Sequence, residues 1–124
     1  MSGEIPGDAL FVNPGGVFSA GNPGFLITAT ASGSAHTLHT AVTGTDDVDL
    51  VTLWAWTVSG ANQTMTLEVG GVTIGPFAVF RNAMPTLVFA RLPMNNGITL
   101  KAFAGAASVV GVFVSTTRLI KQTV

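Results

Sequence analysis

The fold is decided by the run VDLVTLWAWTV, residues 48–58, and by the run QTMTLEV, residues 63–69, that follows it. The two faces of the first run carry Val48, Leu50, Trp54, Trp56 and Val58 on one side, and Val51, Leu53 and Ala55 on the other. A strand with apolar residues on both faces is buried on both, in a core or at a contact between subunits. The second run alternates apolar and polar residues, which predicts a strand with one buried face.

Similar short β-rich runs continue on both sides of this pair, separated by turn residues rich in Gly, Asn and Ser. We expect strands at residues 26–30, 35–43, 48–58, 63–69, 72–80, 86–92, 98–104 and 108–119. Their spacing of roughly 8–12 residues, without any helical apolar stripe, indicates an antiparallel sandwich or barrel. Eight strands favour an all-β, jelly-roll-like sandwich. An immunoglobulin-like sandwich is the alternative, although its Cys–Trp–Cys pattern is absent.

Residues 1–25 have a different composition, with three prolines set among glycines. Neither a long helix nor a central strand fits such a segment. It is nevertheless too apolar for a disordered tail. We therefore predict an extended arm over residues 1–25, ahead of a single β-sandwich domain over residues 26–124. The apolar residues expected to hold the arm on a neighbouring chain are Ile5, Leu10, Phe11, Val12, Phe18 and Phe25.

The overall composition excludes several classes of protein. Of the 124 residues only 9% are charged and the net charge is −1, so a basic nucleic-acid interface is not expected. The most apolar stretch, residues 102–114, is interrupted by glycine and serine and is shorter than the ~18 residues of a membrane-spanning helix. Ordinary soluble domains carry roughly 25% charged residues. So little charge predicts a surface that is rich in Thr, Ser, Asn and Gly, or one that is covered in part by other subunits.

The candidate catalytic and metal-binding residues are few, and we expect no cofactor. His36 and His39 are three apart, which on a strand places their side chains on opposite faces, so we interpret them as ordinary strand histidines. Asp46, Asp47 and Asp49 form one acidic cluster that lacks the Gly and Glu of a calcium-binding EF-hand. A turn cap is the expected role, and a cation that bridges subunits is the alternative. Without a nucleophile–base set, the sequence predicts no enzyme.

Trp54 and Trp56 fall on the same face of the longest predicted strand. Large aromatic side chains dominate protein cores and interfaces alike, so a core or oligomer contact is the expected role of this pair. Aromatic rings on a sandwich also stack on sugars, and carbohydrate binding is the alternative.

The stretch from His39 to Gly71 resembles small virion proteins of tailed bacteriophages, namely the capsid decoration (cement) proteins with a jelly-roll core. The resemblance is carried by Gly44–Asp47, the strand over residues 48–58, Ser59–Ala61 and Gly70-Gly71, and extends loosely through Asn95–Gly97. It implies a non-enzymatic structural protein, made in the bacterial cytoplasm and placed on the outside of the phage head as a homotrimer. Its implied partners are the major capsid protein and other copies of itself.

Two other functions stay open from the sequence. One is a receptor- or glycan-binding module of a tail or head fibre, which shares the sandwich but needs an exposed aromatic surface. The other is a jelly-roll protein that forms the capsid shell itself, for which 124 residues would be small.

Overall fold

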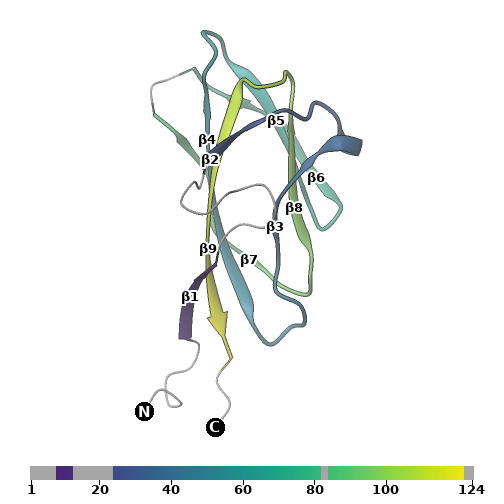
Figure 1. Ribbon diagram of the computed structural model, residues 1–124, viewed down its shortest axis with the longest axis vertical. Coiled ribbons are helices and arrows are strands. Elements are labelled where there is room, and N and C mark those ends of the chain that lie inside the picture. The colour runs from purple at the N-terminus through teal and green to yellow at the C-terminus, as the bar shows by residue number, and fades with distance from the viewer. Residues whose placement is uncertain (1–7, 13–23, 82–83, 122–124) are drawn as a thin grey trace.

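The computed structural model describes residues 8–12, 24–81 and 84–121 of the chain. Apart from the short 3-10 turn η2 (Ser32–Ser34), the regular elements in these ranges are all strands (Figure 1). In chain order they are β1 (Asp8–Val12), β2 (Gly24–Ile27), β3 (His36–Thr40), β4 (Val48–Thr57), β5 (Gln63–Val69), β6 (Val72–Val79), β7 (Thr86–Met94), β8 (Thr99–Ala104) and β9 (Val110–Ile120).

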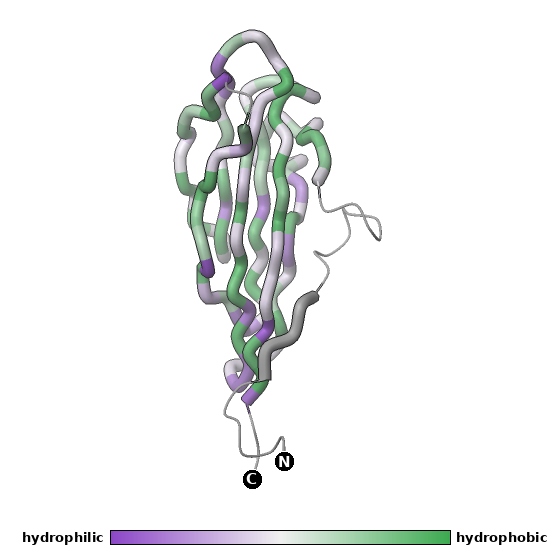
Figure 2. The backbone as a smooth tube through the Cα atoms, turned by 90° about the vertical axis from the view of Figure 1, so that its left-hand side faces the viewer, coloured by the Kyte–Doolittle hydropathy of each residue, from purple (hydrophilic) through white to green (hydrophobic). Residues whose placement is uncertain are grey.

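The strands form two antiparallel sheets that pack face to face. One sheet has the order β1-β9-β4-β7, with β2 also paired to β9, and the other has the order β3-β8-β5-β6. From β2 to β9 this is the strand order of an eight-stranded jelly roll, and it differs from the order of an immunoglobulin sandwich. The strands run along the long axis of the molecule (Figures 1 and 2). The predicted all-β, jelly-roll-like sandwich is confirmed.

All eight predicted strands are present, with ends that differ by a few residues from those expected. Turn residues explain why the hairpins fall where they do. Gly70 and Gly71, between β5 and β6, have φ angles of 57° and 82°, and Asn96 and Gly97, between β7 and β8, have 57° and 71°. Such left-handed conformations match the twist of two paired strands, and Gly and Asn adopt them most readily.

The arm contains a strand that the sequence did not predict. Residues 8–12 form β1, whose backbone pairs with Thr116–Ile120 of β9, while β2 pairs with Val110–Phe113 of the same strand. Two short segments therefore share one edge of the sheet. Phe25 lies inside β2, which crosses the expected boundary between arm and domain. Leu10, Phe11 and Val12 belong to β1, and Ile5 and Phe18 lie outside the described residues.

The hydrophobic core lies between the two sheets. Its most buried side chains come from six strands and include Ile27, Leu38, Val51, Leu53, Met65, Leu67, Leu100, Val110, Val112 and Val114. Along β4 the buried side is that of Val51, Leu53 and Ala55. The opposite side, with Trp54 and Trp56, is the outer face of the sheet. Of the two expected roles for the tryptophans, the core role is therefore wrong, because neither belongs to the buried cluster.

Trp56 is held on this outer face by a pocket of small residues. Its ring lies 4.6 Å from the ring of Phe113, and it covers Gly111 of β9 and Gly24 of β2. A Cβ atom added at Gly111 would overlap atoms of the Trp56 ring. Gly111 thus gives the indole its place against the sheet.

We predict that Gly111→Ala lowers the free energy of unfolding by about 1–3 kcal/mol, the usual cost of an overpacked site. Urea unfolding monitored by tryptophan fluorescence measures the change. Gly33→Ala is the matched control, since an added Cβ there has nothing within 4 Å. Equal stability of the two variants would contradict the role given to Gly111.

Candidate functional site: a buried ion cluster and an open apolar edge

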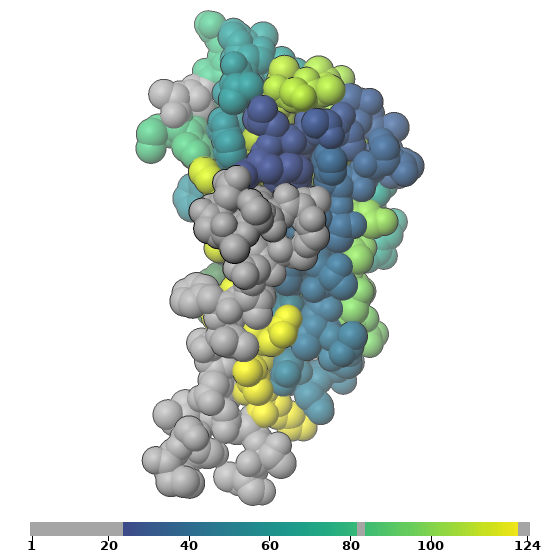
Figure 3. All heavy atoms as spheres, viewed as in Figure 1, coloured from purple at the N-terminus to yellow at the C-terminus, as the bar shows by residue number. Residues whose placement is uncertain are grey.

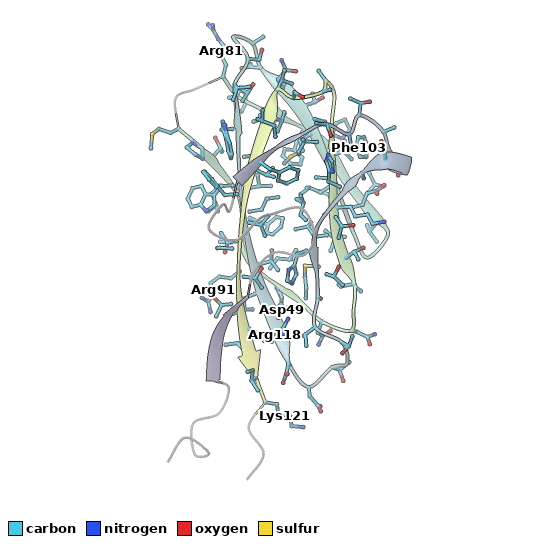
Figure 4. The ribbon with its side chains drawn as sticks, in the orientation of Figure 1. Asp49, Arg81, Arg91, Phe103, Arg118 and Lys121 are labelled. Atoms are coloured by element: carbon cyan, nitrogen blue, oxygen red, sulfur yellow. The ribbon has the colours of Figure 1, made fainter. Side chains whose placement is uncertain are left out.

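A buried cluster of charged side chains surrounds Asp49 near the start of β4 (Figure 4). The carboxylate is fully buried and accepts hydrogen bonds from Arg118 on β9, with Nε at 2.7 Å and Nη2 at 3.2 Å. It also accepts one from the backbone N–H of Val42 at 3.0 Å and lies 2.7 Å from Nε2 of His39. Because an ionised carboxylate only accepts, Nε2 of His39 carries the proton. The cluster joins β3 in one sheet to β4 and β9 in the other.

The electrostatics of the cluster favour the charged form of Asp49. Burial acts to raise the pKa of the carboxyl group, but the hydrogen bonds from Arg118, His39 and Val42 outweigh it, so the pKa lies below the ordinary 3.8. The hydrogen bond to Asp49 in turn raises the pKa of Arg118. The cluster is therefore an ion pair that fastens the two sheets. Its carboxylate is already bonded to four donor groups, which leaves it unsuited to act as a base.

The two histidines lie on the same face of β3, so the prediction that they point to opposite faces is wrong. His36 pairs with Ala102 and His39 with Leu100, both inward-facing residues of β8, and the register shifts between Thr37 and His39. A bulge adds one residue to the strand and so reverses the alternation of its side chains. His36 and His39 nevertheless bind different partners.

His36 fastens the corner between β2 and β3. Its Nε2 accepts the backbone N–H groups of Thr28 at 3.1 Å and Ala29 at 3.3 Å, and its ring meets the Phe25 ring edge-on at 5.3 Å. Both histidines thus have structural partners, as ordinary strand histidines do. Figure 3 shows this corner, in dark blue, on the surface beside the turn that precedes β9.

The three aspartates of the acidic cluster do not form a common site. Asp49 is bonded inside the sandwich, whereas Asp47 accepts the backbone N–H of Lys121 at 2.9 Å. Asp46 is exposed and lies 3.6 Å from Nζ of Lys121. Within the described ranges, no group of three or more His, Asp or Glu side chains is placed to hold a metal ion.

An apolar groove opens at the edge of the sandwich where β6 and β7 are the last strands of their sheets. We call it the edge groove. Its volume is about 540 Å³, and its walls include Ile74, Phe77 and Val79 of β6 and Leu87, Phe89 and Leu92 of β7. Ala55 and Leu67, both fully buried core residues, also line it. At this edge the core is thus reached directly from the surface.

A second apolar depression lies on the outer face beside the same edge. It has a volume of about 400 Å³ and is lined by Trp54, Met84, Pro85, Phe113, Val114 and Ser115. We call it the Trp54 patch. Trp54 is 38% exposed and is the register partner of Leu87, which is 44% exposed and lines the edge groove. The two apolar surfaces therefore meet at Leu87.

The sequence analysis found Trp54 but missed the edge groove, since β6 and β7 show only ordinary strand patterns. One signal was available. Residues 72–94 are strongly apolar and carry just two charged residues, Arg81 and Arg91, which is unusual for strands at the edge of a sheet.

No protein-family model matches the chain, and no curated protein matches it. In the part of the chain that the structure describes, no helix has the length and apolar character needed to cross a membrane.

We predict that Asp49→Asn lowers the free energy of unfolding at pH 7 by about 2–4 kcal/mol, because Arg118 loses its partner in a largely buried site. The lowered pKa of Asp49 sets the pH dependence. The stabilisation is fully present above pH 3.8, the ordinary value, and is lost as pH falls through the folded-state pKa.

Urea unfolding at a series of pH values between 7 and 2 checks this, with Asp46→Asn as the matched control on an exposed aspartate. The difference in the free energy of unfolding between Asp49→Asn and the unsubstituted protein should become smaller as the pH is lowered toward 2. A difference that stays constant over the whole pH range would contradict the ion-pair role.

Proposed function

We propose that this chain is a non-enzymatic structural protein of a virion, and specifically a decoration protein bound to the outside of a phage head. The observation that carries the proposal is the open apolar edge of a sandwich whose sequence is only 9% charged. Exposed apolar surface that continues into a core indicates a surface made for contact with other chains. The resemblance to phage decoration proteins implies that the partner at this surface is the major capsid protein.

The architecture suits such a role. The ion cluster at Asp49 joins the two sheets from inside, and His36 joins β3 to the end of β2 at the surface, so the two sheets that carry the apolar surfaces are fastened to each other. A protein that binds only the assembled lattice stabilises that lattice by mass action. Many copies on one shell further raise the effective strength of a modest contact.

The arm fits the same role. β1 and β2 fasten part of it to β9. Ile5, one of the apolar residues that the sequence predicts to contact a neighbouring chain, precedes β1 in the sequence. In the proposal the neighbour is the major capsid protein or another copy in a homotrimer.

The test uses phage heads that lack the protein. We expect the purified chain to bind such heads at a fixed copy number, to appear by cryo-electron microscopy on their outer surface, and to raise the temperature at which they release DNA. Density confined to the tail, or no binding to heads, would contradict the proposal.

One observation favours a second candidate, the glycan-binding module. The Trp54 ring is accessible in a shallow depression beside Ser115, an arrangement in which an indole could stack on a sugar. A glycan array probed with the unsubstituted protein and with Trp54→Ala separates the two functions. We predict no glycan binding by either protein. Binding that Trp54→Ala abolishes would favour the module over the decoration protein.

A further inference from the structure

We propose that the edge groove binds the amino-terminal segment, residues 1–7, of a second copy of this chain. The inference deepens the proposed function, on which it rests, by naming the partner of one surface. Ile5 is the apolar side chain that would enter the groove, and Glu4 lies next to it in the sequence.

The first step is that a partner must bind the edge groove through its side chains, because the edges of the two sheets do not accept an additional strand. Pro76 in β6 and Pro93 in β7 lack a backbone N–H, and each of these edge strands is irregular. Gly75 and Arg91 have φ angles of 107° and 54°, which interrupts the extended backbone. Prolines and bulges of this kind prevent a further strand from pairing along an edge. The occupant must therefore bind mainly by inserting apolar groups between the sheets.

The second step is charge. Residues 72–94, which include β6 and β7, carry Arg81 and Arg91 and no acidic residue. Arg81 follows the end of β6, where its Nη1 donates to the backbone carbonyl of Gly60 at 3.1 Å, and Arg91 adjoins the lining residue Leu92. Both arginines are exposed, and Figure 4 shows Arg81 at the upper end of the molecule and Arg91 on the left in its lower half. The fitting occupant is thus an apolar segment with negative charge.

The third step is that the chain itself contains such a segment. Within residues 1–7 the charged residue is Glu4, which is acidic and precedes Ile5 and Pro6. Residues 1–7 precede β1, and seven extended residues span roughly 23–25 Å. This length is enough to cross from one molecule to an adjacent one.

The fourth step is the position of donor and acceptor. β1 lies on the β9 side of its sheet, and β7, which borders the groove, is the strand at the other side. When a segment at one edge of a subunit binds the opposite edge of the next subunit, the contact is head-to-tail. Such contacts form a closed ring when the rotation that relates neighbouring subunits is a whole fraction of a turn. A two-fold contact of groove against groove would instead bring like charges together. The geometry therefore favours a cyclic assembly such as the expected trimer.

The test is a charge-reversal cycle on the isolated full-length chain, followed by sedimentation equilibrium and native mass spectrometry. Glu4→Lys reverses the charge of the segment, and Arg81→Glu with Arg91→Glu reverses the charge beside the groove. We expect each reversal to weaken association by about threefold to fivefold, the size expected for one exposed ion pair. All three substitutions in one chain should restore association, because opposite charges then face each other again.

Two controls keep the result specific. Lys101→Glu reverses a cation on β8, away from both the groove and β1, and should leave association unchanged. Ile5→Asp replaces the apolar anchor with a charge and should weaken association, whereas Val58→Asp, at a 58% exposed site, should not. Circular dichroism confirms that each variant folds.

A chain that stays monomeric, a groove reversal without effect, or a triple variant whose association does not recover would overturn the inference. If the groove reversal abolished binding to phage heads but left self-association intact, another protein would be the occupant and the inference would also fail. The decoration proposal is judged separately, by head binding of the unsubstituted chain.

Discussion

The open edge between β6 and β7 leaves part of the hydrophobic core accessible from the surface. Ala55 and Leu67 belong to the core, yet they also line a groove that reaches the surface. Apolar surface in such a position costs free energy in water until another group covers it. At the same time Pro76 and Pro93 prevent the simplest cover, an additional strand. The edge thus accepts side chains from a partner while it resists uncontrolled strand pairing.

The other side of the sandwich is closed by polar contacts. His36 binds the backbone where β2 ends, and Asp49 joins His39 to Arg118 across the two sheets. Removing one partner from a buried ion pair is expensive, whereas the intact pair adds little net stability. We therefore interpret the cluster as a device that fixes how the sheets sit against each other. A fixed geometry is what a repeated contact on a lattice requires.

The strands could be predicted from the sequence because their apolar and polar residues alternate and because Gly70-Gly71 and Asn96-Gly97 mark the hairpins. The candidate site could not. The ion cluster combines residues 39, 49 and 118, which only the folded topology brings together, and a bulge beside Leu38 places both histidines on one face. The packing of the Trp56 ring against the sheet depends on Gly111 in a neighbouring strand. The edge groove arises from which strands end the sheets, and no local pattern encodes that order.

We propose that other chains cover the β6–β7 edge in the assembled state. Hydrogen–deuterium exchange of residues 72–94, compared between dilute protein and the assembled state, tests this proposal. We expect slower exchange in this region on assembly, with the strongest protection beside Ile74 and Leu87. Exchange that is unchanged there, while protection appears elsewhere on the molecule, would contradict it.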